Sequence, residues 1–116
     1  AYYNRGNAFK AKGLLDQALS DHTKAIKIDT AFVKAYSNRG VIYCLKKEFD
    51  KALSDFNKAS EISPKYVFTY RNRASAYFDL KDYKKSWEDV RKVKALGGAM
   101  DPEFLEDLKK ASGREG

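Results

Sequence analysis

The chain alternates between stretches of apolar side chains spaced for helices and short polar breaks. From residue 49 to residue 62, apolar positions recur every three or four residues, at Phe49, Ala52, Leu53, Phe56, Ala59 and Ile62. That spacing places them on one face of a helix. A second apolar stripe surrounds Gly40, and the polar run at residues 46–48 separates the two. Pro64 ends the later stripe, since proline cannot continue a helix. The pattern predicts two antiparallel helices joined by a short turn.

This pair of helices is repeated along the chain. The segment YYNRG at residues 2–6 returns as YSNRG at 36–40 and as YRNRA at 70–74, each time 34 residues later. Residues 1–32 laid over 35–66 give 14 identities in 32 positions, so the first two units are close copies. We therefore predict three helical pairs, at residues 1–32, 33–66 and 67–100.

The last part of the chain departs from this repeat. Gly97 and Gly98 close the third unit, and Asp101 followed by Pro102 is a typical helix start. A narrow apolar stripe then runs along an otherwise charged helix, at Phe104, Leu108 and Ala111. We predict that residues 101–116 form a capping helix and a short tail. Such a helix covers the last repeat and turns a polar side to water.

The period and the positions of small and aromatic residues resemble the tetratricopeptide repeat. The second unit carries the fullest match, at Tyr36, Gly40, Tyr43, Phe49, Ala52, Phe56, Ala59 and Pro64. The resemblance implies an all-α, right-handed α-solenoid of three antiparallel helix-turn-helix repeats with a C-terminal capping helix. It also implies a module that binds other proteins and carries no catalysis.

An arginine stands where this family usually has leucine, at Arg5, Arg39 and Arg73. Sixteen residues later each unit has an aspartate, at Asp21, Asp55 and Asp89. Since each pair spans the two helices of one unit, we predict a bidentate ion pair between them. The alternative is a row of arginines that binds anions.

Composition limits the chemistry further. The 116 residues carry a net charge of +7 and include one cysteine and one histidine. Cys44 alone makes no internal disulfide or multi-thiolate metal site, and His22 alone makes no paired-histidine site. His22 stands where the second unit has Phe56, so we interpret it as an aromatic substitute near the core. We expect no enzyme activity, no cofactor and no metal.

The resemblance leaves one candidate site, a concave groove lined by the first helix of each unit. The residues expected to form this peptide-binding groove are Tyr3, Asn4, Asn7, Lys10, Lys34, Asn38, Val41, Phe68, Arg71, Asn72, Ser75 and Phe78. Asparagine can donate to and accept from a peptide backbone, and Lys and Arg favour carboxylates. We expect Tyr3, Phe68 and Phe78 to be exposed, which favours a ligand with apolar groups. The predicted ligand is an extended peptide with acidic and apolar residues; a solvated face without ligand preference is the alternative.

Co-chaperone members of the family hold the C-terminal carboxylates of chaperone tails with a clamp of two lysines, two asparagines and an arginine. Asn7 and Asn38 match the clamp asparagines. Tyr3 and Phe68 replace the lysines, and Asn72 replaces the arginine. Lys34 and Arg71 lie nearby in the sequence and are the candidates to take over their role.

Other partners follow less well from the sequence. A basic array with aromatics is compatible with single-stranded nucleic acid, but the outer helices interleave lysines with acids and form no continuous stripe. A scaffold that self-associates weakly through its first repeat is a further alternative to a monomer. No apolar run is long enough for a membrane span and no leader opens the chain, so we expect a cytoplasmic protein without a membrane partner.

Overall fold

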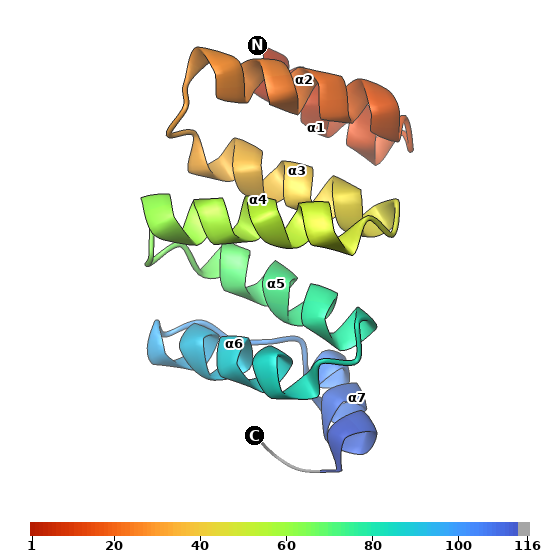
Figure 1. Cartoon of the computed structure of the whole chain (residues 1–116), viewed down its shortest axis with the longest axis vertical. Helices are drawn as coiled ribbons and strands as arrows, with labels where there is room; N and C mark the ends of the chain where they lie inside the picture. The colour runs from red at the N-terminus through yellow and green to blue at the C-terminus, as the bar shows by residue number, and fades with distance from the viewer. Residues whose placement is uncertain (114–116) are drawn as a thin grey trace. The chain divides into compact units, whose positions relative to one another are not determined.

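The computed structural model describes residues 1–113, which contain only α-helices and connecting turns (Figure 1). Residues 114–116 of the predicted tail lie outside the described residues. The helices are α1 (Tyr2–Ala11), α2 (Leu15–Ile28), α3 (Val33–Leu45), α4 (Phe49–Ile62), α5 (Val67–Asp79), α6 (Tyr83–Ala95) and α7 (Pro102–Ser112). The chain divides after Pro64 into two compact units, each larger than a single repeat: the first unit contains α1–α4 and the second contains α5–α7.

The first unit consists of two helical pairs. Helix α1 packs along α2 and α3 packs along α4, while α2 also packs against α3 and so joins the pairs. The junction is built on small buried residues, Ala25 and Ala35, together with Ile26. Tyr2, Tyr3, Phe32 and Tyr36 pack around them. Small residues let the helix backbones approach, and the rings close the edge of the core.

Two glycines set the distance between paired helices in this unit. A Cβ at Gly40 would lie 2.6 Å from Cε1 of Phe56, and a Cβ at Gly6 would lie 3.0 Å from Nε2 of His22. Both rings are fully buried. His22 therefore occupies the core position that Phe56 occupies one repeat later, which confirms its interpretation as an aromatic substitute.

The turn inside each helical pair has the same backbone shape three times. Gly13, Lys47 and Lys81 all adopt a positive φ, of 78°, 60° and 63°. In each turn the following N–H bonds back to a carbonyl five residues earlier, as Leu14 does to Phe9 at 2.9 Å. This is the Schellman motif, whose left-handed position suits glycine best. Two of the three turns therefore hold a strained lysine.

In the second unit, α5 pairs with α6 and α7 packs against α6. Asp101 accepts a hydrogen bond from the Glu103 N–H at 2.9 Å and Pro102 is the first helical residue, so the predicted start of α7 is confirmed. The indole N–H of Trp87 donates to Ser112 Oγ at 3.0 Å. Leu108 of α7 is fully buried. The described part of the capping helix is thus fastened to α6.

Candidate functional site

The structure distributes the predicted groove residues over α1, α3 and α5, in three degrees of exposure. Asn4, Lys34, Arg71 and Ser75 are exposed. Half-buried are Tyr3, Asn7, Lys10, Val41, Phe68, Asn72 and Phe78. Asn38 is buried. The three aromatic residues that the sequence argument took as exposed are therefore largely covered by neighbouring groups.

In the first unit, a hydrogen-bonded cluster joins α1 to α3. The Asn38 side-chain amide donates to Tyr3 Oη at 3.0 Å and to the Lys34 carbonyl at 2.9 Å. Because a carbonyl only accepts, the amide nitrogen must face Lys34, and both of its hydrogens are used. Asn38 therefore fixes Tyr3 against the base of Lys34, and its Oδ1 is the atom that these bonds leave for another donor.

An apolar pocket opens beside this cluster. Its volume is about 240 Å³, and it is lined by Ala1, Tyr2, Tyr3, Ala25, Ile28, Asp29 and Phe32. Tyr3 is a wall of the pocket because its ring packs on Phe32, with centroids 4.8 Å apart, and meets His22 edge-on at 5.5 Å. Ile28 is 74% exposed at the rim. Phe32 and Ile28 lie outside the first helices and were not among the predicted groove residues.

In the second unit, two predicted groove residues contact the segment that follows α6. Arg71 Nε donates to the Ala99 carbonyl at 2.8 Å. The Phe78 ring packs on Phe104 of α7, with centroids 5.5 Å apart, and on Tyr83 at 5.7 Å. Arg71 and Phe78 are therefore partly engaged by their own unit.

Asn72, also on α5, is hydrogen-bonded within its own helix. Its amide donates to the Phe68 carbonyl at 2.9 Å, as Asn38 does to the carbonyl four residues before it in α3. Phe68 itself packs on Tyr66, with centroids 5.9 Å apart. One amide hydrogen of Asn72 is thus bonded within its own helix, whereas Ser75, about one turn further on, is exposed.

The arginine–aspartate pairs confirm the predicted bidentate bridges. Arg39 contacts both carboxylate oxygens of Asp55, at 2.8 and 2.7 Å, and Arg73 contacts those of Asp89 at 2.9 and 2.7 Å. The pair in the first repeat, Arg5 with Asp21, has both distances at 2.8 Å.

Each arginine of these pairs also lies near a tyrosine ring of its own helix. The guanidinium carbon is 5.4 Å from the Tyr2 ring centroid for Arg5, 5.7 Å from Tyr36 for Arg39 and 5.4 Å from Tyr70 for Arg73. The arginines are thus engaged within their repeats by cation–π contacts as well as ion pairs. This structural role does not favour the alternative of an anion-binding row.

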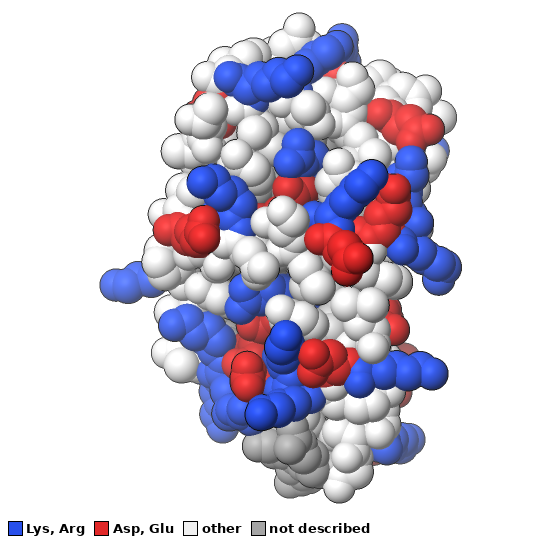
Figure 2. Space-filling model, in the orientation of Figure 1, with Lys and Arg blue, Asp and Glu red and all other residues white. Residues whose placement is uncertain are grey.

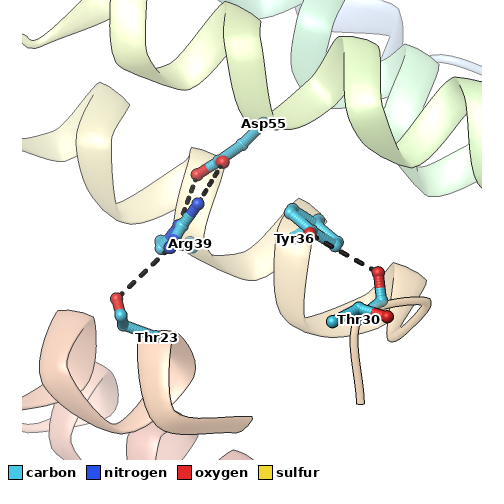
Figure 3. A network of polar contacts seen from close by, with 5 residues as sticks. All are labelled: Thr23, Thr30, Tyr36, Arg39 and Asp55. Atoms are coloured by element: carbon cyan, nitrogen blue, oxygen red, sulfur yellow. Dashed lines mark hydrogen bonds and ion pairs between the residues drawn. The ribbon is translucent and has the colours of Figure 1, made fainter. Parts of the chain in front are cut away.

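The second of these bridges also links neighbouring repeats. Arg39 Nη1 donates to Thr23 Oγ1 of α2 at 3.3 Å, while its other nitrogens face Asp55 (Figure 3). A second link runs from Lys46 Nζ to Asp16 Oδ1 at 2.5 Å. Sequence reasoning missed both links, although the recurrence of lysine at residues 12 and 46 was a signal for one of them.

Burial determines the protonation of several of these groups. It lowers the pKa of His22 to about 4, because no protein group hydrogen-bonds either ring nitrogen within the described residues. The hydrogen bonds from Arg5 lower the pKa of Asp21. For Asp55 and Asp89, burial raises the pKa and outweighs the opposing effect of the arginine.

The charges on the visible surface are mixed in sign. Figure 2 shows acidic side chains lying among the lysines and arginines on the face it draws. Within residues 1–113, no group of three or more His, Cys, Asp or Glu side chains is placed to hold a metal ion. None of the described helices is both long and apolar enough to cross a membrane.

Comparison with protein families explains the 34-residue period. The tetratricopeptide repeat model matches residues 1–30 and 33–66, which is more than half of the chain. The chain belongs to the tetratricopeptide repeat family. A comparison with curated proteins gives no match.

Several solved tetratricopeptide repeat domains have the same fold. The first TPR of Spaghetti (RPAP3), bound to HSP90 peptide SRMEEVD, is 28% identical with a TM-score of 0.88; the match covers 97% of this chain and 88% of that one. The first TPR domain of human RPAP3 is 28% identical with a TM-score of 0.87, covering 97% and 87%. The Sgt2 TPR domain from Aspergillus fumigatus is 27% identical with a TM-score of 0.85, covering 97% and 75%.

These matches establish the fold class as an all-α solenoid of helical repeats. They also identify the chain as a protein-interaction module, in a family whose fold is generally non-catalytic. Membership of the tetratricopeptide repeat family thus agrees with the predicted class of function.

Proposed function

We propose that this chain is a non-catalytic protein-interaction module that binds an extended peptide with acidic and apolar side chains along the first helices of its repeats. The module comprises three repeats, at residues 1–32, 33–66 and 67–100, and the capping helix that begins at residue 101. The family model matches the first two repeats. The third has the same paired helices, α5 and α6, with the same arginine–aspartate bridge.

The observation that carries the proposal is the apolar pocket that has Tyr3 as a wall. Asn38 holds Tyr3 and the Lys34 backbone together through its two hydrogen bonds. The backbone of the exposed Lys34 is therefore tied to Tyr3, which is a wall of a pocket lined by tyrosine, phenylalanine, isoleucine, alanine and Asp29. An apolar ligand side chain fills such a pocket, and a neighbouring carboxylate pairs with the ammonium group.

The rest of the α1 and α3 face supplies polar groups for an extended backbone. The polar groups are Asn7 and Lys10, which are half-buried on α1, while the half-buried Val41 of α3 adds an apolar contact. Asparagine amides suit peptide N–H and C=O groups, which an extended chain leaves unpaired. In the second unit, Asn72 and Ser75 offer the same chemistry on α5.

The peptide bound by the first TPR of Spaghetti has the proposed composition, since SRMEEVD combines acidic residues with Met and Val. This chain keeps asparagines at Asn7 and Asn38 but has Tyr3 and Phe68 where the co-chaperone clamp has lysines. We therefore propose that the ligand's apolar side chain and its acidic groups contribute to affinity, with Lys34 replacing part of the clamp.

Isothermal titration with the peptide SRMEEVD tests this proposal. We expect measurable binding, loss of binding when both Glu residues of the peptide are replaced by Lys, and weakening of about fivefold or more for Lys34→Glu. The matched control is Lys58→Glu, an exposed lysine on α4 with the same change in charge. Equal affinity of the two variants, or indifference to the peptide charge, contradicts the proposal.

A further inference from the structure

An apolar pocket lies between α6, α7 and the loop that connects them. Its volume is about 330 Å³, and its lining residues are Val90, Lys94, Gly98, Ala99, Met100 and Leu105. The first two belong to α6, the next three to the connecting loop and the last to α7. Three consecutive segments of the second unit therefore bound this α6–α7 pocket. None of its residues is among the predicted groove residues or lines the pocket beside Tyr3.

The pocket is open because smaller or polar side chains stand where the first unit has core residues. Val90 is in register with His22 and Phe56, whose rings are fully buried, yet Val90 itself is only half-buried. Lys94 is in register with Ile26, which belongs to the core where α2 meets α3. Valine fills less space than a ring, and lysine keeps its ammonium group in water. The junction of α6 and α7 therefore lacks side chains that fill the junction of α2 and α3.

The walls of the α6–α7 pocket are held in place by hydrogen bonds and by the buried face of α7. The Ala99 carbonyl accepts from Arg71 Nε at 2.8 Å, and the Gly98 N–H donates to the Val93 carbonyl at 2.9 Å. Leu108 of α7 is fully buried. The loop is thus fixed to α5 and α6, and α7 is anchored in the same unit. Because the pocket is preformed, binding does not require ordering of the loop.

The chemistry of the pocket is mostly apolar, with one exposed charge. Val90, Met100 and Leu105 are half-buried, so each keeps apolar surface that a ligand can cover. Lys94 is exposed and is the only charged residue of the lining. A volume of about 330 Å³ is near the lower end of the ~300–1,000 Å³ that small-ligand pockets have. This size suits one bulky apolar side chain, and the ammonium group suits a carboxylate next to it.

We propose that the α6–α7 pocket anchors a leucine-sized apolar side chain from an extended segment of a partner protein, and that an acidic residue beside it pairs with Lys94. A protein segment is the occupant because the chain belongs to a family of protein-interaction modules. Since the one charge of the lining is positive, an acidic neighbour complements it and a basic neighbour is repelled. This pocket is a second anchoring site, apart from the surface of α1 and α3 that the proposed function uses.

Titration of the 116-residue chain with the blocked peptide acetyl-DLLE-amide, followed through backbone amide chemical shifts, tests this inference. We expect saturable changes at Gly98, Ala99 and Leu105, and none with acetyl-DAAE-amide, which lacks the leucines. Lys94→Glu should weaken binding of DLLE about fivefold or more, and acetyl-KLLK-amide should bind this variant more tightly than it binds the unchanged chain. The matched control is Lys84→Glu, an exposed lysine on the same helix, which should leave the affinity unchanged.

Three outcomes overturn the inference. One is the absence of saturable changes up to about 10 mM peptide, which saturates a site of millimolar affinity. Another is an equal effect of Lys94→Glu and Lys84→Glu. The third is a different occupant, either octanoate binding the pocket more tightly than the peptide or concentration-dependent changes without any peptide, which indicate a second copy of this chain. Because SRMEEVD titrations report on Lys34 and these report on Lys94, failure of one proposal leaves the other measurable.

Discussion

Replacing Gly40 by alanine should destabilise the first unit through one steric contact. A Cβ at this position lies 2.6, 2.9 and 2.9 Å from three atoms of the Phe56 ring. Ordinary carbon–carbon contacts are about 3.5–4.0 Å, so the ring or the helix must move by roughly an ångström. Phe56 is fully buried and has no free space to move into.

The magnitude follows from two opposing effects. Overpacking a buried site costs about 3 kcal/mol at the upper end of its usual range, and alanine gains about 1 kcal/mol over glycine inside a helix. Gly40→Ala should therefore lower the free energy of unfolding by about 2 kcal/mol. The third repeat avoids this conflict in its sequence, because Ala74 and Val90 stand where Gly40 and Phe56 stand.

A double-mutant cycle isolates this contact. In a Phe56→Val background the ring is gone, so Gly40→Ala should raise stability by about 1 kcal/mol, which gives a coupling energy of about 3 kcal/mol. Urea denaturation followed by far-UV circular dichroism measures all four proteins. If Gly40→Ala has the same effect in the wild-type and the Phe56→Val backgrounds, the steric account of the helix spacing is refuted.

Three further changes test other parts of the structure. Lys47→Gly should raise the free energy of unfolding by about 0.5–1 kcal/mol in urea denaturation. Glycine removes the steric strain of the left-handed backbone at residue 47, and the greater conformational entropy of glycine in the unfolded chain offsets part of this gain. The pKa of His22 is lowered to about 4, so the folded protein binds fewer protons at this residue than the unfolded chain does. About 3 kcal/mol of the free energy of unfolding is therefore lost as the pH falls from 6.5 to 4. Urea titrations across this pH range should show that His22→Phe removes this part of the loss. Arg39→Met should cost about 3 kcal/mol because it leaves buried Asp55 unpaired, and an equal stability of Arg39→Met and wild type in thermal unfolding would contradict the role of the bridge.

The repeat period made most of the fold predictable. Because each helical pair recurs with small residues at fixed places, the sequence located the helices and the capping helix and identified His22 as an aromatic substitute near the core. The arginine–aspartate bridges were predictable for the same reason, since both partners recur in all three repeats. The turns were less visible, because Lys47 and Lys81 adopt a conformation that the residue type itself disfavours.

The details of the candidate site were harder to predict, because periodicity places a residue on a face but does not identify its neighbours. Asn38 lies on the expected face, yet both amide hydrogens are committed to Tyr3 and Lys34. Arg71 lies on α5, but its bond to the Ala99 carbonyl comes from a loop outside the repeat pattern. Such contacts depend on side-chain geometry that no single-helix pattern contains.

The central claim is that a peptide binds to the first helices of the repeats rather than to the outer ones. Backbone amide chemical-shift mapping during titration with SRMEEVD tests it most directly. The account predicts that the largest changes cluster at Asn7, Lys34 and Val41 and around the pocket beside Tyr3. Changes confined to the surfaces of α2 and α4 away from that pocket, or no changes at saturating peptide, would contradict it.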